Sequence, residues 1–326
     1  MSNAEENPET ITCPAATAHG PCVQLWPARE VPLGGVRGVS VSRTLPQRGL
    51  PTVGAWCFLD SFGPAEPEMS VLPHPHIGLQ TVTWPLSGVI RHRDSLGSDV
   101  LVRPGELNLM TAGNGIAHSE FSWLEDSSSA EPMRGLQFWV ALPESSRHDE
   151  PAFEQHRELP DFDSGGLRIR VLLGELAGHR SPATTFSPLV GAEISATTDG
   201  VNMLPLEPSF EHALLVLDGS LRIDGQDIAP GPLAFLGAGR HELSLEAETG
   251  SRFVLIGGEP FTEELVMWWN FVARSQEDIE AARQDWEAQS GRFPAVAGHG
   301  PEAGAEAGRI PAPPLPNVRL TPRRRG

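Results

Sequence analysis

Four residues in two short segments of the chain could hold a metal ion. His74 and His76 lie in LPHPHIGLQ, and His118 and Glu120 lie in NGIAHSEF. On an extended strand the side chains of residues i and i+2 point to the same side, so each pair shares one face. If both strands line one barrel, three imidazoles and one carboxylate converge inside it. This donor set suits a first-row divalent metal (Fe, Ni, Cu, Mn or Zn) and not Ca²⁺ or Mg²⁺.

The donor types also impose a pH requirement on this site. An imidazole binds a metal only in its neutral form, and a carboxylate binds only when it is ionised. We therefore expect the metal to be lost as the pH falls through the titration range of histidine.

The residues that follow His76 are candidates for the wall of a substrate pocket. Gln80 comes four residues after His76 and lies on the same face if the strand continues without a break. Val82 and Trp84 continue that face and would supply an apolar, aromatic wall. A neutral amide is a poor metal ligand, so Gln80 would contact the substrate or a metal ligand. The alternative is that Gln80 and Trp84 are ordinary core residues.

The other histidines lack a partner at ligand spacing. His92, in RHRDSLGSD, is interpreted as a surface residue, and Asp94 and Ser95 as shaping the turn that follows through local hydrogen bonds. His212 stands alone where a second copy of the pattern would place its histidine pair. We therefore expect one metal site, in the first half of the chain.

Short strands must position these residues. Alternating polar and apolar residues, broken by Ser-Gly, Pro-Gly and Asp-Gly pairs, predict strands of about five or six residues. Residues 81–110 and 213–236 share one layout, in which a glycine turn and a Pro-Gly pair separate three strands. The pattern predicts an all-β protein with a duplicated barrel or sandwich domain, and not alternating βαβ units.

One helix is predicted near the C-terminus, in SQEDIEAARQDWEAQSG. Ser275 can cap its first turn, and Asp278 completes a capping box. Ile279, Ala282 and Trp286 fall near one face, so we expect the helix to pack on a barrel.

The composition excludes several classes of protein. The 326 residues include 42 acidic and 24 basic side chains, a net charge of −18, and no Lys or Tyr. Nucleic acid binding depends on Lys and Arg, so we expect no nucleic acid partner. No apolar run is long enough for a membrane-spanning helix, and the N-terminus lacks the features of a secretory signal. Three cysteines without CxxC spacing argue against a disulfide framework and favour a cytoplasmic location.

The chain resembles the pirin family of the cupin superfamily over roughly residues 24–295. The resemblance rests on HPHIGLQTVTWPLSGVIRHRDSLGS, RPGELNLMTAGNGIAHSE, FLDSFGPAE and MWWNFVARSQEDIEAARQDW. It implies two antiparallel cupin barrels with a C-terminal segment between them, and one metal, usually iron, in the first barrel. The ligands of the family carry over onto His74, His76, His118 and Glu120. Gln80 departs from the family, because many pirins have Glu there.

The composition and the resemblance together divide the chain into four parts. We expect a flexible N-terminal tail at 1–23 and a metal-binding cupin domain at 24–155. A second cupin domain without metal ligands, ending in the helix, is expected at 156–294. The Pro/Gly/Arg-containing residues 295–326 are expected to be a second tail or an arm wrapped on the body.

The resemblance implies two classes of function. Some pirins open the ring of the flavonol quercetin with O₂, which implies a dioxygenase with a small aromatic or phenolic substrate. Glu120 would then take the proton of the substrate hydroxyl as general base. Animal pirin is a nuclear transcriptional co-regulator, so the alternative is a non-enzymatic, metal- or redox-dependent regulator with a protein partner. A third hypothesis is a structural cupin whose metal only stabilises the fold.

Overall fold

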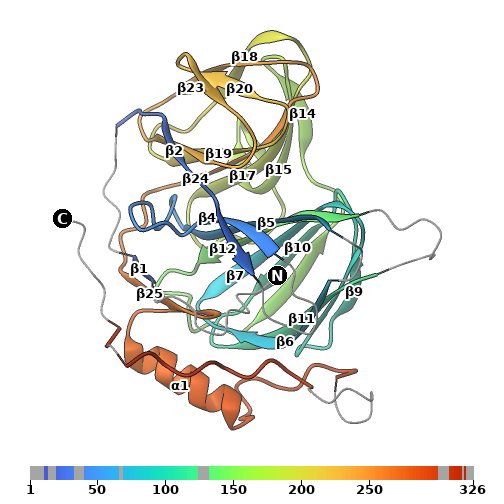
Figure 1. The fold of residues 1–326 in the computed structure, drawn as a ribbon, viewed down its shortest axis with the longest axis vertical. Coiled ribbons are helices and arrows are strands. Elements are labelled where there is room, and N and C mark those ends of the chain that lie inside the picture. Colours follow the sequence, from blue (N-terminus) through green and yellow to red (C-terminus); the bar gives the residue numbers. More distant parts are fainter. Residues whose placement is uncertain are drawn as a thin grey trace.

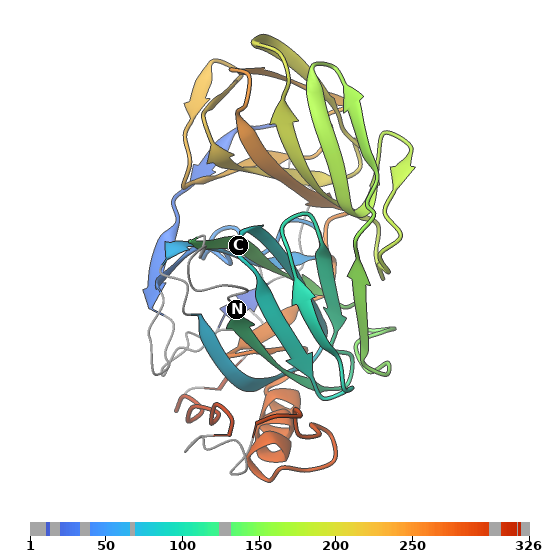
Figure 2. The same cartoon turned by 90° about the vertical axis from the view of Figure 1, so that its right-hand side faces the viewer.

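A computed structural model shows how these elements are arranged (Figure 1). It describes residues 11–13, 20–32, 40–65, 69–123, 132–299, 308–317 and 319–320. This part of the chain is almost entirely β, with one helix near the C-terminal end. Two barrels are stacked along the long axis of the molecule (Figure 2), so the predicted all-β, two-barrel fold is confirmed.

The first barrel consists of two antiparallel sheets. The larger sheet has the strand order β13-β10-β7-β12-β5-β4-β3, and the smaller has the order β6-β11-β8-β9. The strands are β3 (Arg29–Pro32), β4 (Ser40–Leu45), β5 (Trp56–Ala65), β6 (Ser70–His76), β7 (Leu79–Ser87), β8 (Ile90–Asp94), β9 (Asp99–Val102), β10 (Leu107–Thr111), β11 (Ile116–Ser122), β12 (Met133–Ala141) and β13 (Ala152–His156).

The second barrel repeats this arrangement. Its larger sheet has the order β14-β15-β17-β24-β19-β22-β2, with β16 paired to β15, and its smaller sheet has the order β18-β23-β20-β21. The strands are β2 (Gln24–Trp26), β14 (Asp161–Ser164), β15 (Leu167–Leu176), β16 (His179–Arg180), β17 (Leu189–Ala196), β18 (Gly200–Pro205), β19 (Glu211–Asp218), β20 (Leu221–Ile223), β21 (Gln226–Ile228), β22 (Leu233–Gly237), β23 (Glu242–Ala247) and β24 (Arg252–Gly258).

The two barrels pack through the outer face of the larger sheet of the first barrel. Trp56 Nε1 donates to Gly257 O at 3.0 Å, and Trp84 Nε1 donates to Glu193 Oε2 at 2.5 Å. Apolar side chains of both barrels merge into one core around these tryptophans. The larger sheet is therefore covered on both faces, which explains why its central strands are buried at nearly every position.

The N-terminal segment contributes to both barrels. Strand β2 pairs with β22 of the second barrel, whereas β3 pairs with β4 of the first. Strand β1 (Ile11–Cys13) pairs with β25 (Leu265–Trp268), next to β26 (Phe271–Ala273). The expected tail at 1–23 therefore contains a strand, and the expected domain start at residue 24 falls in a strand of the second barrel. The tail residues 1–10 and 14–19 lie outside the described part of the chain.

The helix α1 (Gln276–Glu287) begins where the sequence predicts. Ser275 is its N-cap, and the Ser275 Oγ accepts a hydrogen bond from Asp278 N at 3.2 Å. The three apolar residues predicted for one face are the buried ones. In the described part of the chain, no helix is long and apolar enough to cross a membrane.

The helix packs on the first barrel, at the end of the molecule far from the second barrel (Figure 1). Its buried face joins Ile77 and Ala117 in one apolar cluster. The C-terminal segment implied to lie between the barrels therefore lies outside them. The reason is that the outer side of β6 and β11 offers the apolar surface that this helix face needs.

The described part of the C-terminal tail is an arm on the body. Ile310 N donates to Pro73 O at 2.8 Å, and Ile310 O accepts from Trp286 Nε1 at 2.9 Å. The arm thereby ties α1 to β6. Residues 300–307 and 321–326 lie outside the described part.

Candidate metal centre

The smaller sheet of the first barrel brings the four predicted metal ligands together. Strands β6 and β11 are antiparallel neighbours, and the register places His118 opposite His74 and Ile116 opposite His76. His74, His76, His118 and Glu120 are all at most 1 % exposed. The ligand atoms of the three histidines lie within 4.8 Å of one another.

Backbone carbonyls determine the tautomers of two of these histidines. His74 Nδ1 lies 2.8 Å from Leu72 O, and His76 Nδ1 lies 3.1 Å from Asn270 O. A carbonyl oxygen only accepts hydrogen bonds, so each Nδ1 carries the proton and donates it. The lone pair of each ring is therefore on Nε2, where a metal can bind it.

A relay of two side chains determines the tautomer of His118. The Asp94 carboxylate accepts from His92 Nε2 at 3.1 Å, which leaves a lone pair on His92 Nδ1. His118 Nδ1 lies 3.4 Å from this atom and donates to it. The lone pair of His118 is therefore also on Nε2.

The prediction that His92 is a surface residue is wrong. His92 is 2 % exposed, and its ring stacks on Phe153 with the centroids 4.6 Å apart. The prediction for Asp94 is confirmed, because Asp94 Oδ1 accepts from the backbone N–H groups of Leu96 and Ser98 in the turn. The pattern RHRDSLGSD shows the turn but not the strand pairing that buries His92.

The arrangement of the three Nε2 atoms fits a metal ion. His74 Nε2 is buried and has no hydrogen-bonding partner in the described part of the chain. His76 Nε2 and His118 Nε2 lie 3.1 Å apart, and two lone pairs at that distance repel each other unless a cation lies between them. Two nitrogen ligands about 2.1 Å from one metal, at a right angle, are about 3 Å apart.

Burial keeps these imidazoles in the form that binds a metal. Desolvation lowers the pKa of His74 to about 4 and lowers the pKa values of His76 and His118 well below the usual range. Neighbouring histidines lower the pKa values of His76 and His118 further. All three rings are therefore neutral at pH 7.

Glu120 lies beside the three histidines, at the side of His118. Its carboxylate is within 4.8 Å of the ligand atoms of His92 and His118. Thr83 Oγ1, from the opposite sheet, lies 3.2 Å from Glu120 Oε1 and donates to it. The carboxylate is thus held between the two sheets of the barrel.

The strand that carries His76 does not continue to Gln80. Gly78 separates β6 from β7 with φ at +67°, and a Cβ there would meet Val272 O at 2.0 Å. Only glycine fits this turn, after which the chain enters the other sheet. The alternation that starts at His76 therefore does not extend across residue 78.

The expected pocket residues lie on the outer face of β7 as a result. Gln80 Nε2 donates to Thr184 O at 3.1 Å, in the second half of the chain. Trp84 contacts the second barrel, as described above, and Val82 lies between Gln80 and Trp84 on the same face. Thr83 alternates with them and points to Glu120. The expectation that Gln80, Val82 and Trp84 share a face with His76 is therefore wrong.

Aromatic side chains from the larger sheet enclose the histidines instead. The Trp139 ring meets the His76 ring edge-on at 5.3 Å between centroids, and it stacks on Phe58 at 4.0 Å. These residues come from β5 and β12, far from the histidine motifs in the sequence. Their alternation marks them as strand residues, but only the sheet order shows which metal-site residue they face.

A row of polar side chains crosses the inner face of the larger sheet. Cross-strand pairing places them opposite one another in the order Arg43, Asp60, Gln137, Thr83 and Asn108. All five are at most 3 % exposed. Arg43 donates to both carboxylate oxygens of Asp60 at 2.8 and 2.9 Å, and Thr83 Oγ1 lies 3.1 Å from Gln137 Oε1. The first barrel therefore has a polar interior on both sheets.

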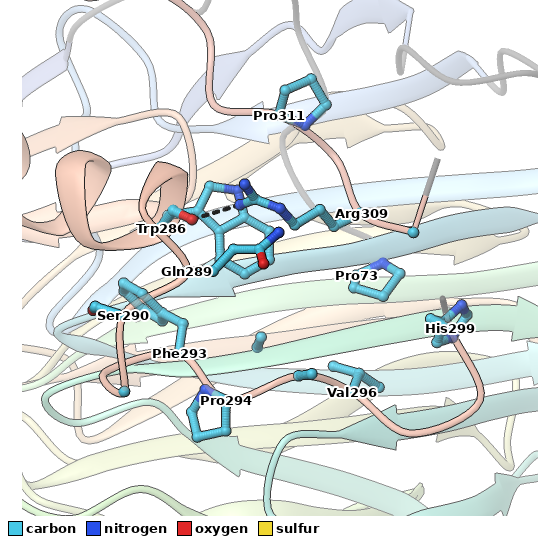
Figure 3. Close-up of a pocket in the computed structure, with 14 residues that line it drawn as sticks. Pro73, Trp286, Gln289, Ser290, Phe293, Pro294, Val296, His299, Arg309 and Pro311 are labelled. Atoms are coloured by element: carbon cyan, nitrogen blue, oxygen red, sulfur yellow. Dashed lines mark hydrogen bonds between the residues drawn. The ribbon is translucent and has the colours of Figure 1, made fainter. Parts of the chain in front are cut away.

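A cavity of about 770 Å³ lies on the opposite side of the histidine-bearing sheet (Figure 3). Pro73 and Ala117 form part of its wall, and Trp286, Phe293 and Arg309 form another part. Pro73 and Ala117 alternate with the histidines on β6 and β11, so they point away from the metal site. This cavity is therefore separate from the site.

The second barrel has an apolar interior. A cluster of buried aliphatic and aromatic side chains fills it, including Leu214, Leu243 and Phe253. His212 is buried there. Both groups of candidate metal ligands in the described residues lie in the first barrel.

Comparison with known proteins identifies relatives of the whole chain. The Pirin family model matches residues 38–140, and the model of the pirin C-terminal cupin domain matches residues 192–294. A Pseudomonas aeruginosa protein provisionally named quercetin 2,3-dioxygenase is 43 % identical over 323 residues, covering 97 % of this chain and 98 % of its own length. A pirin-like protein of Caulobacter vibrioides is 37 % identical over 83 % of this chain and 94 % of its own length.

A solved structure shows the same architecture. The crystal structure of a quercetin 2,3-dioxygenase from Acinetobacter baumannii is 39 % identical in sequence, with a TM-score of 0.84. The similarity covers 92 % of this chain and 98 % of that one. The likeness therefore includes both barrels.

Proposed function

Because the chain belongs to the pirin family of two-barrel cupins, we propose that it is a metal-dependent dioxygenase that opens the ring of a quercetin-like flavonol with O₂. The observation that carries the proposal is the convergence of three buried histidine Nε2 lone pairs beside one carboxylate. The names of the relatives in Pseudomonas aeruginosa and Acinetobacter baumannii support the reaction class.

We assign one divalent transition metal to His74, His76, His118 and Glu120. Iron is proposed as the metal, and the donor set also suits Ni, Cu, Mn and Zn. When bound, the metal supplies a Lewis acid that favours the ionised form of a substrate hydroxyl. The protein supplies the neutral imidazoles, fixed in orientation by Leu72 O, Asn270 O and the His92–Asp94 relay.

Glu120 is proposed as the general base. The reaction needs the 3-hydroxyl of the flavonol to lose its proton, because the ionised ring is electron-rich enough to react with O₂. The proton passes to a Glu120 carboxylate oxygen, while Thr83 Oγ1 holds the carboxylate toward the barrel interior. Trp139 and Phe153 keep water away from the rings of His76 and His92.

The test is O₂ consumption with quercetin at several known metal occupancies. Turnover should rise in proportion to bound metal and should disappear in His76→Ala. Glu120→Gln should lower turnover about 100-fold or more in protein that retains its metal. Unchanged turnover in metal-loaded Glu120→Gln would rule out the base role.

The alternative is a non-enzymatic, metal-dependent regulator that binds a protein partner. A fully Fe(II)-loaded sample with no O₂ uptake would contradict the dioxygenase proposal and favour this alternative.

A further inference from the structure

One buried amide in the first barrel has no hydrogen-bonding partner among the residues that the structure describes. Asn108 is 2 % exposed, and neither its Nδ2 nor its Oδ1 is paired. More than about 90 % of buried polar groups in folded proteins are paired, so an unpaired amide of this kind requires an explanation. Each unpaired group destabilises the fold, because its hydrogen bonds to water are lost and not replaced.

Asn108 lies on the inner face of the barrel, one strand away from the residue that contacts the carboxylate of the candidate metal site. On β10 it is directly opposite Thr83 of β7 and Gln155 of β13, and directly opposite residues share a face. Thr83 Oγ1 contacts Glu120 from this face. Asn108 is therefore on the inner face of the barrel, directly opposite the residue that contacts the Glu120 carboxylate.

Each of the other members of the polar row contacts another polar group of the protein. Arg43 and Asp60 pair with each other, and Gln137 contacts Thr83 and the carbonyl of Val82. Asn108, at the end of this row, is the member whose polar groups remain available to a ligand.

A second buried asparagine shows what an ordinary structural amide looks like in this fold. Asn202 of the second barrel is 0 % exposed. Its Nδ2 donates to Gly200 O at 2.9 Å, and its Oδ1 accepts from Thr198 Oγ1 at 3.0 Å. The two amides therefore differ in pairing and not in burial.

We propose that Asn108 is a specificity-determining residue that binds two neighbouring oxygens of the substrate. Its Nδ2 donates to an ionised hydroxyl or carbonyl oxygen, and its Oδ1 accepts from an adjacent hydroxyl. This assignment rests on the proposed function. In a quercetin-like flavonol such pairs are the 3-hydroxyl with the 4-carbonyl at the reacting ring and the two hydroxyls of the distant catechol ring; the 5-hydroxyl shares the same 4-carbonyl.

The test compares two matched substitutions in metal-loaded protein. Asn108→Leu and Asn202→Leu each replace a buried amide by an apolar group with the same number of heavy atoms, and Asn108→Ala is a smaller second variant. Binding is measured without O₂ by quenching of tryptophan fluorescence. The probes are 3-hydroxyflavone, which has only the hydroxyl–carbonyl pair, and 3′,4′-dihydroxyflavone, which has the catechol pair and neither a 3-hydroxyl nor a 5-hydroxyl.

Asn108→Leu should weaken the binding of one probe about tenfold, which identifies the oxygen pair. It should also raise the Tm by about 2–4 °C, because an unpaired buried amide is removed. Asn202→Leu should lower the Tm and leave both Kd values unchanged. Asn108→Ala should weaken the binding of the same probe that binds less tightly to Asn108→Leu.

Two results would overturn the assignment. One is unchanged binding of both probes in both Asn108 variants. The other is a Tm loss in Asn108→Leu as large as that in Asn202→Leu, which would show that a bound water or the protein pairs with the amide. Weaker probe binding in a protein that consumes no O₂ would leave this inference standing while the proposed reaction fails. Normal O₂ turnover together with unchanged probe binding in both Asn108 variants would overturn this inference and leave the proposed reaction standing.

Discussion

The two barrels share a topology but differ in what they bury. The inside of the first barrel holds histidines, a carboxylate, amides and an ion pair, whereas aliphatic and aromatic side chains fill the second. A buried polar group costs stability unless it is paired, and an apolar side chain in the same place contributes stability. The polar interior therefore lowers the stability of the first barrel, whereas the apolar interior of the second barrel, which packs against it, contributes stability.

The largest expected difference between the barrels is in metal binding. His118→Ala removes the imidazole that contacts both neighbouring histidines and should lower metal affinity more than 100-fold. His212→Leu removes the buried histidine of the second barrel and should leave metal content unchanged. The metal content of the two purified variants checks both expectations. Loss of metal in His212→Leu would show that the second barrel is part of the site.

Acid should destabilise both barrels, because each contains at least one buried histidine whose pKa is lowered. Burial lowers the pKa of His74 and of His212 to about 4, against about 6.5 in the unfolded chain. Between these values the unfolded state binds more protons, so the free energy of unfolding falls as the pH falls. Each histidine contributes a loss of about 2.5 kcal/mol between pH 7 and pH 4.5.

Urea unfolding of metal-free protein at the two pH values measures this loss. In His212→Leu the loss should be about 2.5 kcal/mol smaller than in the natural protein, because the contribution of this buried histidine is gone. An equal loss in both proteins would contradict the assignment of His212 as a buried neutral group.

The relay behind His118 should have a smaller effect on metal binding than a ligand itself. Asp94→Asn puts an N–H donor where His92 Nε2 now donates. The His92 ring must then carry its proton on Nδ1, and His118 must carry its proton on Nε2, where it blocks the metal. Metal affinity should fall about tenfold or more. The matched change Asp99→Asn, on the exposed neighbouring strand β9, should leave the affinity unchanged.

The smallest effect is expected at the cap of α1. Ser275→Ala removes the hydrogen bond to Asp278 N and should lower the free energy of unfolding by about 1 kcal/mol. Because the helix covers the outer side of β6 and β11, the change should destabilise the first barrel. Ser244→Ala, at an exposed strand position of the second barrel, is the control. Equal free energies of unfolding for the two variants would mean that the cap does not contribute to stability.

Local patterns in the sequence were sufficient to predict much of the fold and of the candidate site. Spacings of two residues placed His74 with His76 and His118 with Glu120 on shared faces, because strand alternation is a property of a few consecutive residues. Capping and turn residues marked the helix and the strand ends for the same reason. The assignment of Gln80, Val82 and Trp84 failed because one glycine ended the strand and the chain moved to the other sheet.

By itself, the sequence determined the candidate metal ligands, the two-barrel architecture and the capped helix. Only the tertiary structure decided which face of β7 points inward, that His92 is buried behind His118, and that Asn108 is left unpaired. These features depend on pairing between strands that are distant in the chain. Burial, tautomers and hydrogen-bond partners follow from such pairing, because they depend on which groups meet across a sheet and which of them water cannot reach.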